Sequence, residues 1–464
     1  MSALPGAAQL ARAIASGEIS AGEALDACLQ RIESSDAKIN AFIGRTFARA
    51  RQEADAVDAL RSCGAPLPPL AGVPYAVKSL FDVQGEVTLA GSKVNQRNAP
   101  AQADAFLVTQ MQRAGAVLVG TLNMDEYAYG FTTENTHYGP THNPHELSRS
   151  AGGSSGGSGA AVAAAQVPIA LASDTNGSIR VPASFCGVWG LKPTFGRLSR
   201  RGSYPFVHSI DHLGPLADSV EALALAYDAL QSPDSQDPAC HALRVQAIGS
   251  ACGLGTNGLR IGRLGGYFEE FATPSANEAA ETAARVLGAT GMALWPDAAL
   301  ARAAAFITTA SEGGRLHLAD LKTQMDDFEP LSVDRFIAGA LQPASWYLRA
   351  QQFRRAYRAR VNALFQDWDV LIAPATPLSA PLLGAEWLDI NGQRLPCSAS
   401  IGLLTQPISF SGCPVVSAPL WPSGTGAMPI GVQLIAAPWR EDLALRAALV
   451  LQQSGAAHLK PVRL

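Results

Sequence analysis

The chain has no long apolar run and little charge, and each absence argues against a class of protein. No stretch of about 18 uninterrupted apolar residues occurs in the 464 residues, so we expect no membrane-spanning helix. The segment Met1 to Gly6 lacks the charged region and apolar core of a secretory signal. Lys and Arg number 35 against 39 Asp and Glu, which gives a net charge of −4 and no basic surface for a polyanion. We therefore expect a cytoplasmic protein that binds neither a membrane nor nucleic acid.

Cysteine is also scarce, and no C-x-x-C pair occurs among the seven residues. Their odd number and scattered positions suit a reducing compartment. His137, His142, His145 and Glu146 do cluster, but the glycine and prolines between them predict a loop, and the spacing is not that of a helical zinc motif. We predict no metal and no cofactor.

What the chain has is apolar residues, 48% of the total, with no Pro/Ser or charged linker to divide them. We predict a single domain over residues 1–464: N-terminal helices at 1–65, a catalytic core at 66–220, and the remainder at 221–464. Ser20 and Glu23 have the spacing of a capping box, which predicts a helix start. The apolar periodicity predicts further helices at 46–60, 103–114, 160–165, 218–231, 277–287 and 343–365, and strands at 72–83, 116–120, 167–172, 259–264 and 369–374. Residues 232–257 read as a surface excursion, and a C-terminal strand and helix close the domain.

Two Gly/Ser turns lie within residues 151–194, and each contains a candidate reactive serine. The first, Gly152 to Gly159, holds Ser154 and leads into an Ala-rich helix, whose N-terminal amides favour developing negative charge. The second, Asp174 to Ser178, follows an apolar strand, and Gly177 permits a backbone twist that aims successive amides at one point. This arrangement predicts an oxyanion hole formed by backbone amides.

Other interpretations of these turns are open at this stage. A Gly/Ser run is most often a linker, but linkers are not usually continued by an uncharged helix and strand. The segment Gly152 to Gly156 fits the G-x-S-x-G nucleophile elbow, which Gly/Ser-rich sequence also matches by chance. Asn176-Gly177-Ser178 is formally a glycosylation sequon.

The serines need a base, and Lys78 is the candidate. It is the one lysine in the apolar stretch 70–83, and burial lowers the pKa of an ammonium group toward the range where it acts as a base. A lone lysine in a strand is more often an edge residue. A rival arrangement is a Ser-His-Asp triad of Ser178, His208 and Asp211, which would make Lys78 dispensable.

Lys78 in LAGVPYAVKSLFDV, both turns, residues 120–144 and residues 428–442 together resemble the amidase signature family over nearly the whole chain. The resemblance implies an α/β fold, with a mixed, mostly parallel sheet covered on both faces by helices. It implies that Ser178 is the nucleophile, that Ser154 relays its proton after a cis peptide, and that Lys78 is the base. The oxyanion would be held by the backbone amides of Thr175, Asn176, Gly177 and Ser178, the second turn would be supported by Asp174 and Arg180, and the substrate pocket would be lined by Tyr129, Thr132 and His137.

Family members hydrolyse aryl amides, fatty amides, malonamide, allophanate and carboxybiuret, or provide the glutaminase activity of a tRNA-dependent amidotransferase as its A subunit. Asn176, where the family commonly has glycine, together with residues 178–216 and 316–355, resembles the carboxybiuret-hydrolysing members. This implies a small anionic ureide substrate in cyanuric acid degradation and a small companion subunit in a heterotetramer. Another ureide or amide, such as biuret, allophanate or malonamide, and glutamine remain alternatives. A non-catalytic scaffold should have lost Lys78, Ser154 or Ser178. Candidates to bind the carboxylate are Arg197, Arg200, Arg201 and Arg335.

Overall fold

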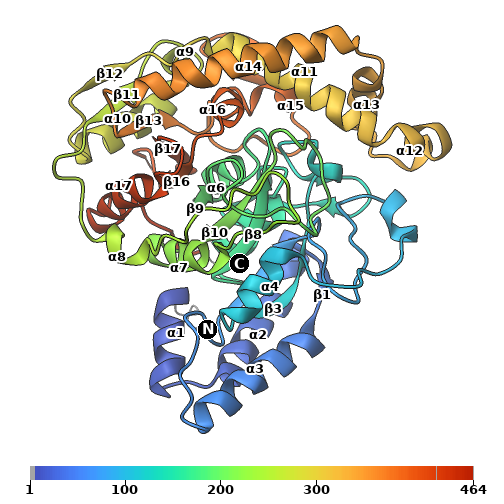
Figure 1. Cartoon of the computed structure of the whole chain (residues 1–464), viewed down its shortest axis with the longest axis vertical. Coiled ribbons are helices and arrows are strands. Elements are labelled where there is room, and N and C mark those ends of the chain that lie inside the picture. Colours follow the sequence, from blue (N-terminus) through green and yellow to red (C-terminus); the bar gives the residue numbers. More distant parts are fainter. Residues whose placement is uncertain (1–5, 425, 463) are drawn as a thin grey trace.

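The computed structural model describes residues 6–424, 426–462 and 464 (Figure 1). The chain starts with helices α1 (Ala7–Ser16), α2 (Ala21–Ile39) and α3 (Phe47–Ser62), which form the narrow lower part of the view. The predicted capping box is confirmed: Ser20 Oγ accepts from the Glu23 amide at 3.0 Å, and the Ser20 amide donates to Glu23 Oε2 at 2.8 Å. This reciprocal pair begins α2 because it satisfies amides that a helix start leaves free.

One sheet of eleven strands runs through the described part of the chain. In spatial order its strands are β1 (Phe42–Arg45), β3 (Val117–Leu122), β2 (Pro74–Lys78), β8 (Ile169–Asp174), β10 (His212–Ala217), β9 (Trp189–Lys192), β16 (Val415–Leu420), β17 (Ile430–Ala436), β13 (Val370–Pro374), β11 (Ile261–Leu264) and β12 (Gly291–Ala293).

The α/β class and the mixed sheet agree with the sequence-based expectation, but parallel pairing is confined to two regions. The strands β3, β2 and β8 are parallel near one edge, and β13, β11 and β12 are parallel at the other. Every pair between β8 and β13 is antiparallel, as is β1 with β3. Parallel neighbours require a crossover, and α4 (Phe106–Arg113) supplies it between β2 and β3. The direct connection of β16 to β17 produces antiparallel neighbours instead.

Side chains alternate between two hydrophobic clusters along the strands, so both faces of the sheet are covered. On β2, Tyr75 and Val77 belong to one cluster and Ala76 to the other. The Ala76 side packs with α2, α3 and α5 (Gly156–Ala163), which supply small residues such as Ala160. Small side chains there allow the helix that follows the first Gly/Ser turn to lie close to the strands.

The remaining helices lie mainly in the second half of the chain. They are α6 (Arg180–Cys186), α7 (Val220–Leu230), α8 (Gly249–Cys252), α9 (Tyr267–Glu270), α10 (Pro274–Val286), α11 (Ala298–Leu316), α12 (Leu318–Thr323), α13 (Val333–Ala340), α14 (Ala344–Leu364), α15 (Cys397–Ser400), α16 (Gln406–Ser411) and α17 (Glu441–Gln453). Short 3-10 turns occur at Val94–Arg97, Glu126–Ala128 and Met325–Asp327. Small two-stranded sheets pair β4 (Glu134–Asn135) with β5 (Gly139–Pro140), β6 (His142–Asn143) with β7 (Glu146–Ser150), and β14 (Trp387–Ile390) with β15 (Gln393–Pro396).

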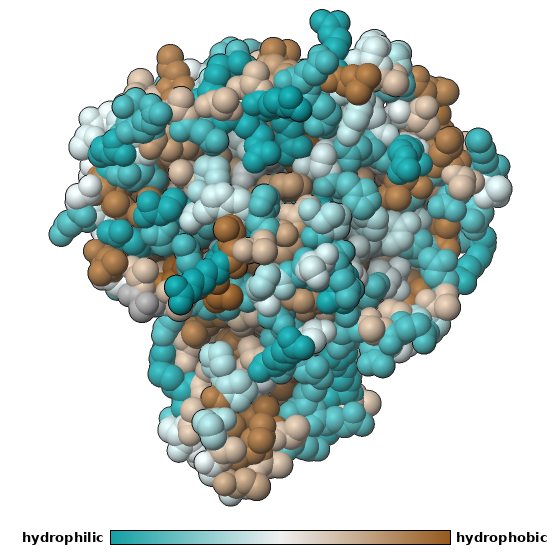
Figure 2. Space-filling view, viewed as in Figure 1, coloured by the Kyte–Doolittle hydropathy of each residue, from teal (hydrophilic) through white to brown (hydrophobic). Residues whose placement is uncertain are grey.

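Hydrophilic and hydrophobic residues are interspersed over the face shown in Figure 2. Within the residues that the structure describes, no helix is long and apolar enough to cross a membrane. The predicted surface excursion at 232–257 is largely irregular and includes the short helix α8.

Candidate active site

The parallel pairing of β2 with β8 brings Lys78 to the Gly/Ser turns. Lys78 is the last residue of β2, and the Val77–Leu171 register places it next to the end of β8. Its ammonium nitrogen Nζ donates to Ser154 Oγ at 2.7 Å and to Ser173 Oγ at 2.9 Å. The predicted lysine and the serine of the first turn are therefore in direct contact, and both are completely buried.

Burial lowers the pKa of Lys78 from 10.5 to about 7, because the charged form loses its hydration. The carboxylates of Asp125, Asp174 and Asp211 act in the opposite direction and keep the pKa from falling further. A lysine with this pKa is substantially neutral near pH 7, which a general base requires.

The first turn is held closely against the loop that contains Asp125. The peptide between Gly153 and Ser154 is cis. A Cβ atom at Gly153 would lie 2.1 Å from Asp125 Oδ2, so only glycine fits there. The Asp125 amide also donates to the Ser154 carbonyl at 3.2 Å. This loop fixes the backbone on both sides of the cis bond.

The second turn is fixed by Thr405, which lies far away in the sequence. Thr405 Oγ1 donates to the Asn176 carbonyl at 2.7 Å. Gly177 has φ of 139°, and a Cβ atom there would lie 2.3 Å from Thr405 Oγ1. The twist expected at Gly177 is therefore present, and Thr405 packs against it.

Asp174 and Arg180 form a completely buried ion pair that holds the ends of this turn together. Arg180 Nε and Nη2 each donate to one Asp174 oxygen at 2.9 Å. Burial alone would raise the pKa of Asp174, but the charge and hydrogen bonds of Arg180 outweigh it and hold that pKa far below its usual range. Arg180 also donates to the Thr405 carbonyl at 3.2 Å and to Gln433 Oε1 at 2.6 Å. The pair thus links the second turn to the C-terminal strands.

Ser178 opens onto a narrow cavity of about 20 Å³. Its described lining residues are Ala128, Tyr129, Gly130, Phe131, Thr175, Asn176, Ser178, Phe206, Phe306, Thr309, Arg335, Ser398 and Gln406. An adjoining cavity of about 280 Å³ shares Tyr129, Gly130, Phe131, Arg335 and Ser398 with it and is also lined by Asp125 and Thr132. The inner cavity has room for a group of about the size of one water molecule, and the outer one adjoins it.

Of the predicted pocket residues, Tyr129 lines both cavities and Thr132 lines the outer one. His137 lines neither. Its Nε2 lies 3.6 Å from Oε1 of the buried Glu126, and this contact raises the pKa of His137. Glu126 itself lines the outer cavity, so His137 contacts a residue of the cavity wall but does not line the cavity.

Of the four candidate arginines, only Arg335 lines the cavities beside Ser178. Arg197 donates to Tyr227 Oη at 3.0 Å and is buried, while Arg200 and Arg201 form ion pairs with Asp237 and Asp234. Arg335 lines both cavities, and its guanidinium lies 4.6 Å from the centre of the Tyr129 ring. Among the described residues that line the inner cavity, Arg335 is the only one with a charged side chain.

The Ser178–His208–Asp211 alternative does not form. Asp211 accepts from Thr175 Oγ1 at 2.6 Å and from the Phe206 and Val207 amides, and His208 is exposed.

The histidines considered as metal ligands also point to separate partners. His142 Nδ1 lies 2.6 Å from the Leu147 carbonyl, and His145 Nε2 lies 3.0 Å from the Cys186 carbonyl. The described residues contain no group of three or more side chains suited to hold a metal ion.

Sequence reasoning missed several residues of the site: Asp125, Ser173, Thr309, Thr405 and Gln406. Asp125 is the informative case, because burial raises its pKa to about 6 and its Oδ2 has no hydrogen-bond partner among the described residues. Only the Asp-Glu pair in the 120–144 block could have drawn attention to it. The last three come from the second half of the chain, where no local pattern marks them.

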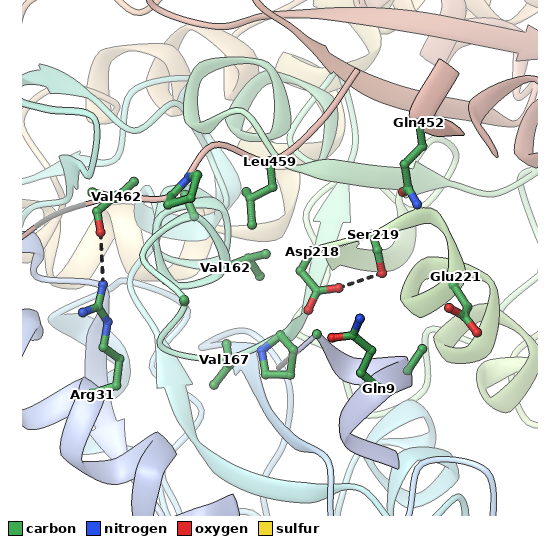
Figure 3. Close-up of a pocket in the computed structure, with 16 residues that line it drawn as sticks. Gln9, Arg31, Val162, Val167, Asp218, Ser219, Glu221, Gln452, Leu459 and Val462 are labelled. Atoms are coloured by element: carbon green, nitrogen blue, oxygen red, sulfur yellow. Dashed lines mark hydrogen bonds between the residues drawn. The ribbon is translucent and has the colours of Figure 1, made fainter. Parts of the chain in front are cut away.

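A cavity of about 350 Å³, larger than the two beside Ser178, lies elsewhere, between α1, the end of α5, the start of α7 and the C-terminal segment (Figure 3). Arg31 donates to the Val462 carbonyl at 3.4 Å at one end, and Ser219 donates to Asp218 at 2.8 Å at the other. The residues around it do not include Lys78, Ser154 or Ser178. The candidate active site is therefore not at this larger cavity.

Comparisons with known proteins agree with the geometry. A family model described as Amidase matches residues 23–445. The AtzE subunit of 1-carboxybiuret hydrolase from Pseudomonas sp. (strain ADP) is 65% identical over 97% of this chain and 99% of the relative. The A subunit of glutamyl-tRNA(Gln) amidotransferase from Moorella thermoacetica is 36% identical over 95% of this chain and 94% of the relative.

Solved structures of two enzymes are also similar to this chain over nearly its whole length. One, described as a vestigial protein complex that reveals the evolutionary origins of an s-triazine catabolic enzyme, has a TM-score of 0.98 at 65% identity and covers 98% of this chain and 100% of its own. A 6-aminohexanoate cyclic dimer hydrolase with bound substrate has a TM-score of 0.88 at 30% identity, with 99% of each chain covered.

Proposed function

Because the chain belongs to the amidase signature family and hydrolyses amide C–N bonds, we propose that it deaminates 1-carboxybiuret to urea-1,3-dicarboxylate and ammonia, a step of s-triazine catabolism. The substrate class is a small anionic ureide. The observation that carries this choice is the inner cavity: it adjoins Ser178, and Arg335 gives it a single cationic side chain. A guanidinium is well suited to bind a carboxylate.

In the proposed mechanism, Ser178 Oγ attacks the terminal carbonyl carbon, and the Ser178 proton passes through Ser154 Oγ to neutral Lys78. The backbone amides of residues 175–178 stabilise the oxyanion. The tetrahedral intermediate collapses to an acyl-enzyme as the relay returns a proton to the departing ammonia. Water then attacks the acyl-enzyme through the same relay, and Ser178 is released. The 2.7 Å contact between Lys78 and Ser154 supports this route.

The experiment is ammonia release from freshly made 1-carboxybiuret, with biuret, malonamide and glutamine beside it. The proteins are wild type, Ser178→Ala and Lys78→Ala. Turnover of carboxybiuret that is lost in both variants supports the substrate and the site. Turnover of glutamine alone would instead favour the glutaminase role of an amidotransferase, and activity that survives in Lys78→Ala would overturn the relay.

Arg335→Gln tests the carboxylate contact. We expect kcat/KM for carboxybiuret to fall about 10- to 100-fold, because a hydrogen-bonded charge contact is lost. Arg315→Gln is the matched control, since Arg315 lies exposed on the neighbouring helix α11. If both substitutions lowered kcat/KM equally, the proposed contact between Arg335 and the substrate carboxylate would be wrong.

We also propose that residues 1–464 form one amidase domain, that it works in the cytoplasm, and that it assembles with a small companion subunit into a heterotetramer. The relative described as part of a protein complex supports this assembly. Purification of the protein from its source cells tests it, with gel analysis for a small chain that co-purifies and light scattering for the mass of the assembly.

A further inference from the structure

Asn176 lies in the wall of the inner cavity, and its position is fixed from two sides. Its side-chain nitrogen Nδ2 donates to Thr309 Oγ1 on α11 at 2.9 Å, and its carbonyl accepts from Thr405 Oγ1 at 2.7 Å. The residue is 7% exposed and belongs to the same turn as Ser178. Asn176 and Ser178 therefore line the same small cavity.

The carbonyl oxygen of the same side chain, Oδ1, is buried and has no hydrogen-bond partner among the described residues. A buried amide oxygen without a partner is rare and destabilising, so its presence in a cavity wall indicates a place for a donor from a ligand.

Two other polar groups of the wall are already engaged. Thr175 Oγ1 donates to Asp211 at 2.6 Å, and Gln406 Oε1 accepts from Arg302 Nε at 3.0 Å. The rest of the wall is largely aromatic, with Tyr129, Phe131, Phe206 and Phe306. Asn176 Oδ1 is therefore a free, buried acceptor in the wall of the cavity that Ser178 also lines.

We propose that Asn176 Oδ1 accepts a hydrogen bond from the N–H beside the scissile carbonyl, and so makes the site selective for ureides over amides that carry a methylene at that position. This inference rests on the proposed function for the orientation of the substrate. In a ureide the carbonyl is flanked by N–H on both sides, whereas a malonyl amide has a methylene on one side. A site built to bind an N–H rejects the analogue without it, because its own acceptor is then left unpaired.

Biuret and malonamide form the matched probe pair, since both have two terminal amides and differ in the central N–H or methylene. Binding of each is measured by calorimetry to Ser178→Ala, which removes turnover and leaves Asn176 in place. We expect biuret to bind about tenfold or more tightly than malonamide. In Asn176→Ala/Ser178→Ala the ratio should fall to about one.

Gln406→Ala in the same background is the control, because its oxygen already has a partner. It should change the affinities for both probes by the same factor. Thr309→Val removes the group that orients the Asn176 amide, and we expect it to reduce the ratio without removing the acceptor. This second variant keeps the test valid if Asn176→Ala does not fold.

In the active enzyme, Asn176→Ala should lower kcat/KM for carboxybiuret about 10- to 100-fold. A biuret preference that survives in both the Asn176 and Thr309 variants would overturn the inference. The outcome is distinct from failure of the proposed function: if wild type does not hydrolyse carboxybiuret, the proposed reaction is wrong, but the affinity ratio still tests Asn176.

Discussion

Replacing Lys78 by methionine tests the buried base through the pH dependence of both rate and stability. Only neutral lysine accepts the relay proton, and burial places the Lys78 pKa at about 7. The neutral fraction is then about 9% at pH 6 and about 91% at pH 8, so wild-type kcat/KM should rise about tenfold over this range. Lys78→Met should lose about 100-fold or more in rate and should not show this rise.

Stability should follow with the same sign. Between about pH 7 and pH 10.5, Lys78 carries a proton in the unfolded chain but not in the folded chain. The free energy of unfolding therefore increases as the pH rises through this range. Within this range each pH unit adds about 1.4 kcal/mol to the free energy of unfolding. The increase is smaller close to pH 7, where the folded chain is still partly protonated, so the total between pH 7 and pH 9 is about 2 kcal/mol. Methionine has no such proton, so this contribution should be missing in Lys78→Met.

The assays are kcat/KM profiles from pH 5.5 to 9 and thermal unfolding of both proteins at pH 7 and pH 9. Lys192 is also buried, with its pKa lowered to about 7 by burial, but it is present in both proteins and cancels in the comparison. A flat wild-type profile, a midpoint near the ordinary lysine value, or the same pH response in both proteins would refute the reasoning.

Three further predictions concern the residues around the relay. Asp125→Asn removes a carboxylate that favours the charged lysine, so the midpoint of the kcat/KM profile should move to lower pH; an unchanged midpoint would show that the carboxylate does not act on the base. Gly177→Ala places a Cβ 2.3 Å from Thr405 Oγ1 in a backbone region unsuited to alanine, and we expect kcat to fall more than about 100-fold while circular dichroism shows a folded chain. Arg180→Met leaves Asp174 charged and buried, so chemical unfolding should show a loss of about 3–5 kcal/mol at pH 7, and a loss under about 1 kcal/mol would contradict the role of the pair.

Local patterns sufficed to predict the elements that carry the reactive residues. The Ser20 capping box, the strand that ends at Lys78 and the helix after the first turn all appear within a few residues of their predicted positions. These predictions succeed because capping, apolar runs and glycine-rich turns act over short stretches of chain. The sequence offered Lys78 as a candidate base, and the family resemblance favoured that role over the more common one of an edge lysine.

The order of the strands in the sheet and the residues that line the cavities could be learned only from the structure. No local signal shows that β9 lies between β10 and β16, and the expectation of mostly parallel strands took no account of the antiparallel centre. Among the four candidate arginines, Arg335 is distinguished by the packing of α13, which places it in the wall of both cavities. His137 was misplaced for the same reason, because its contact with Glu126 arises from the folding of the loop.

The proposed catalytic residues and much of the cavity wall beside them come from different halves of the chain. Lys78, Ser154 and Ser178 lie within the first 178 residues, whereas Phe306, Thr309, Arg335, Ser398 and Gln406 all follow residue 300. Substitutions in the later half can therefore reshape substrate preference while the hydrolytic apparatus is inherited unchanged.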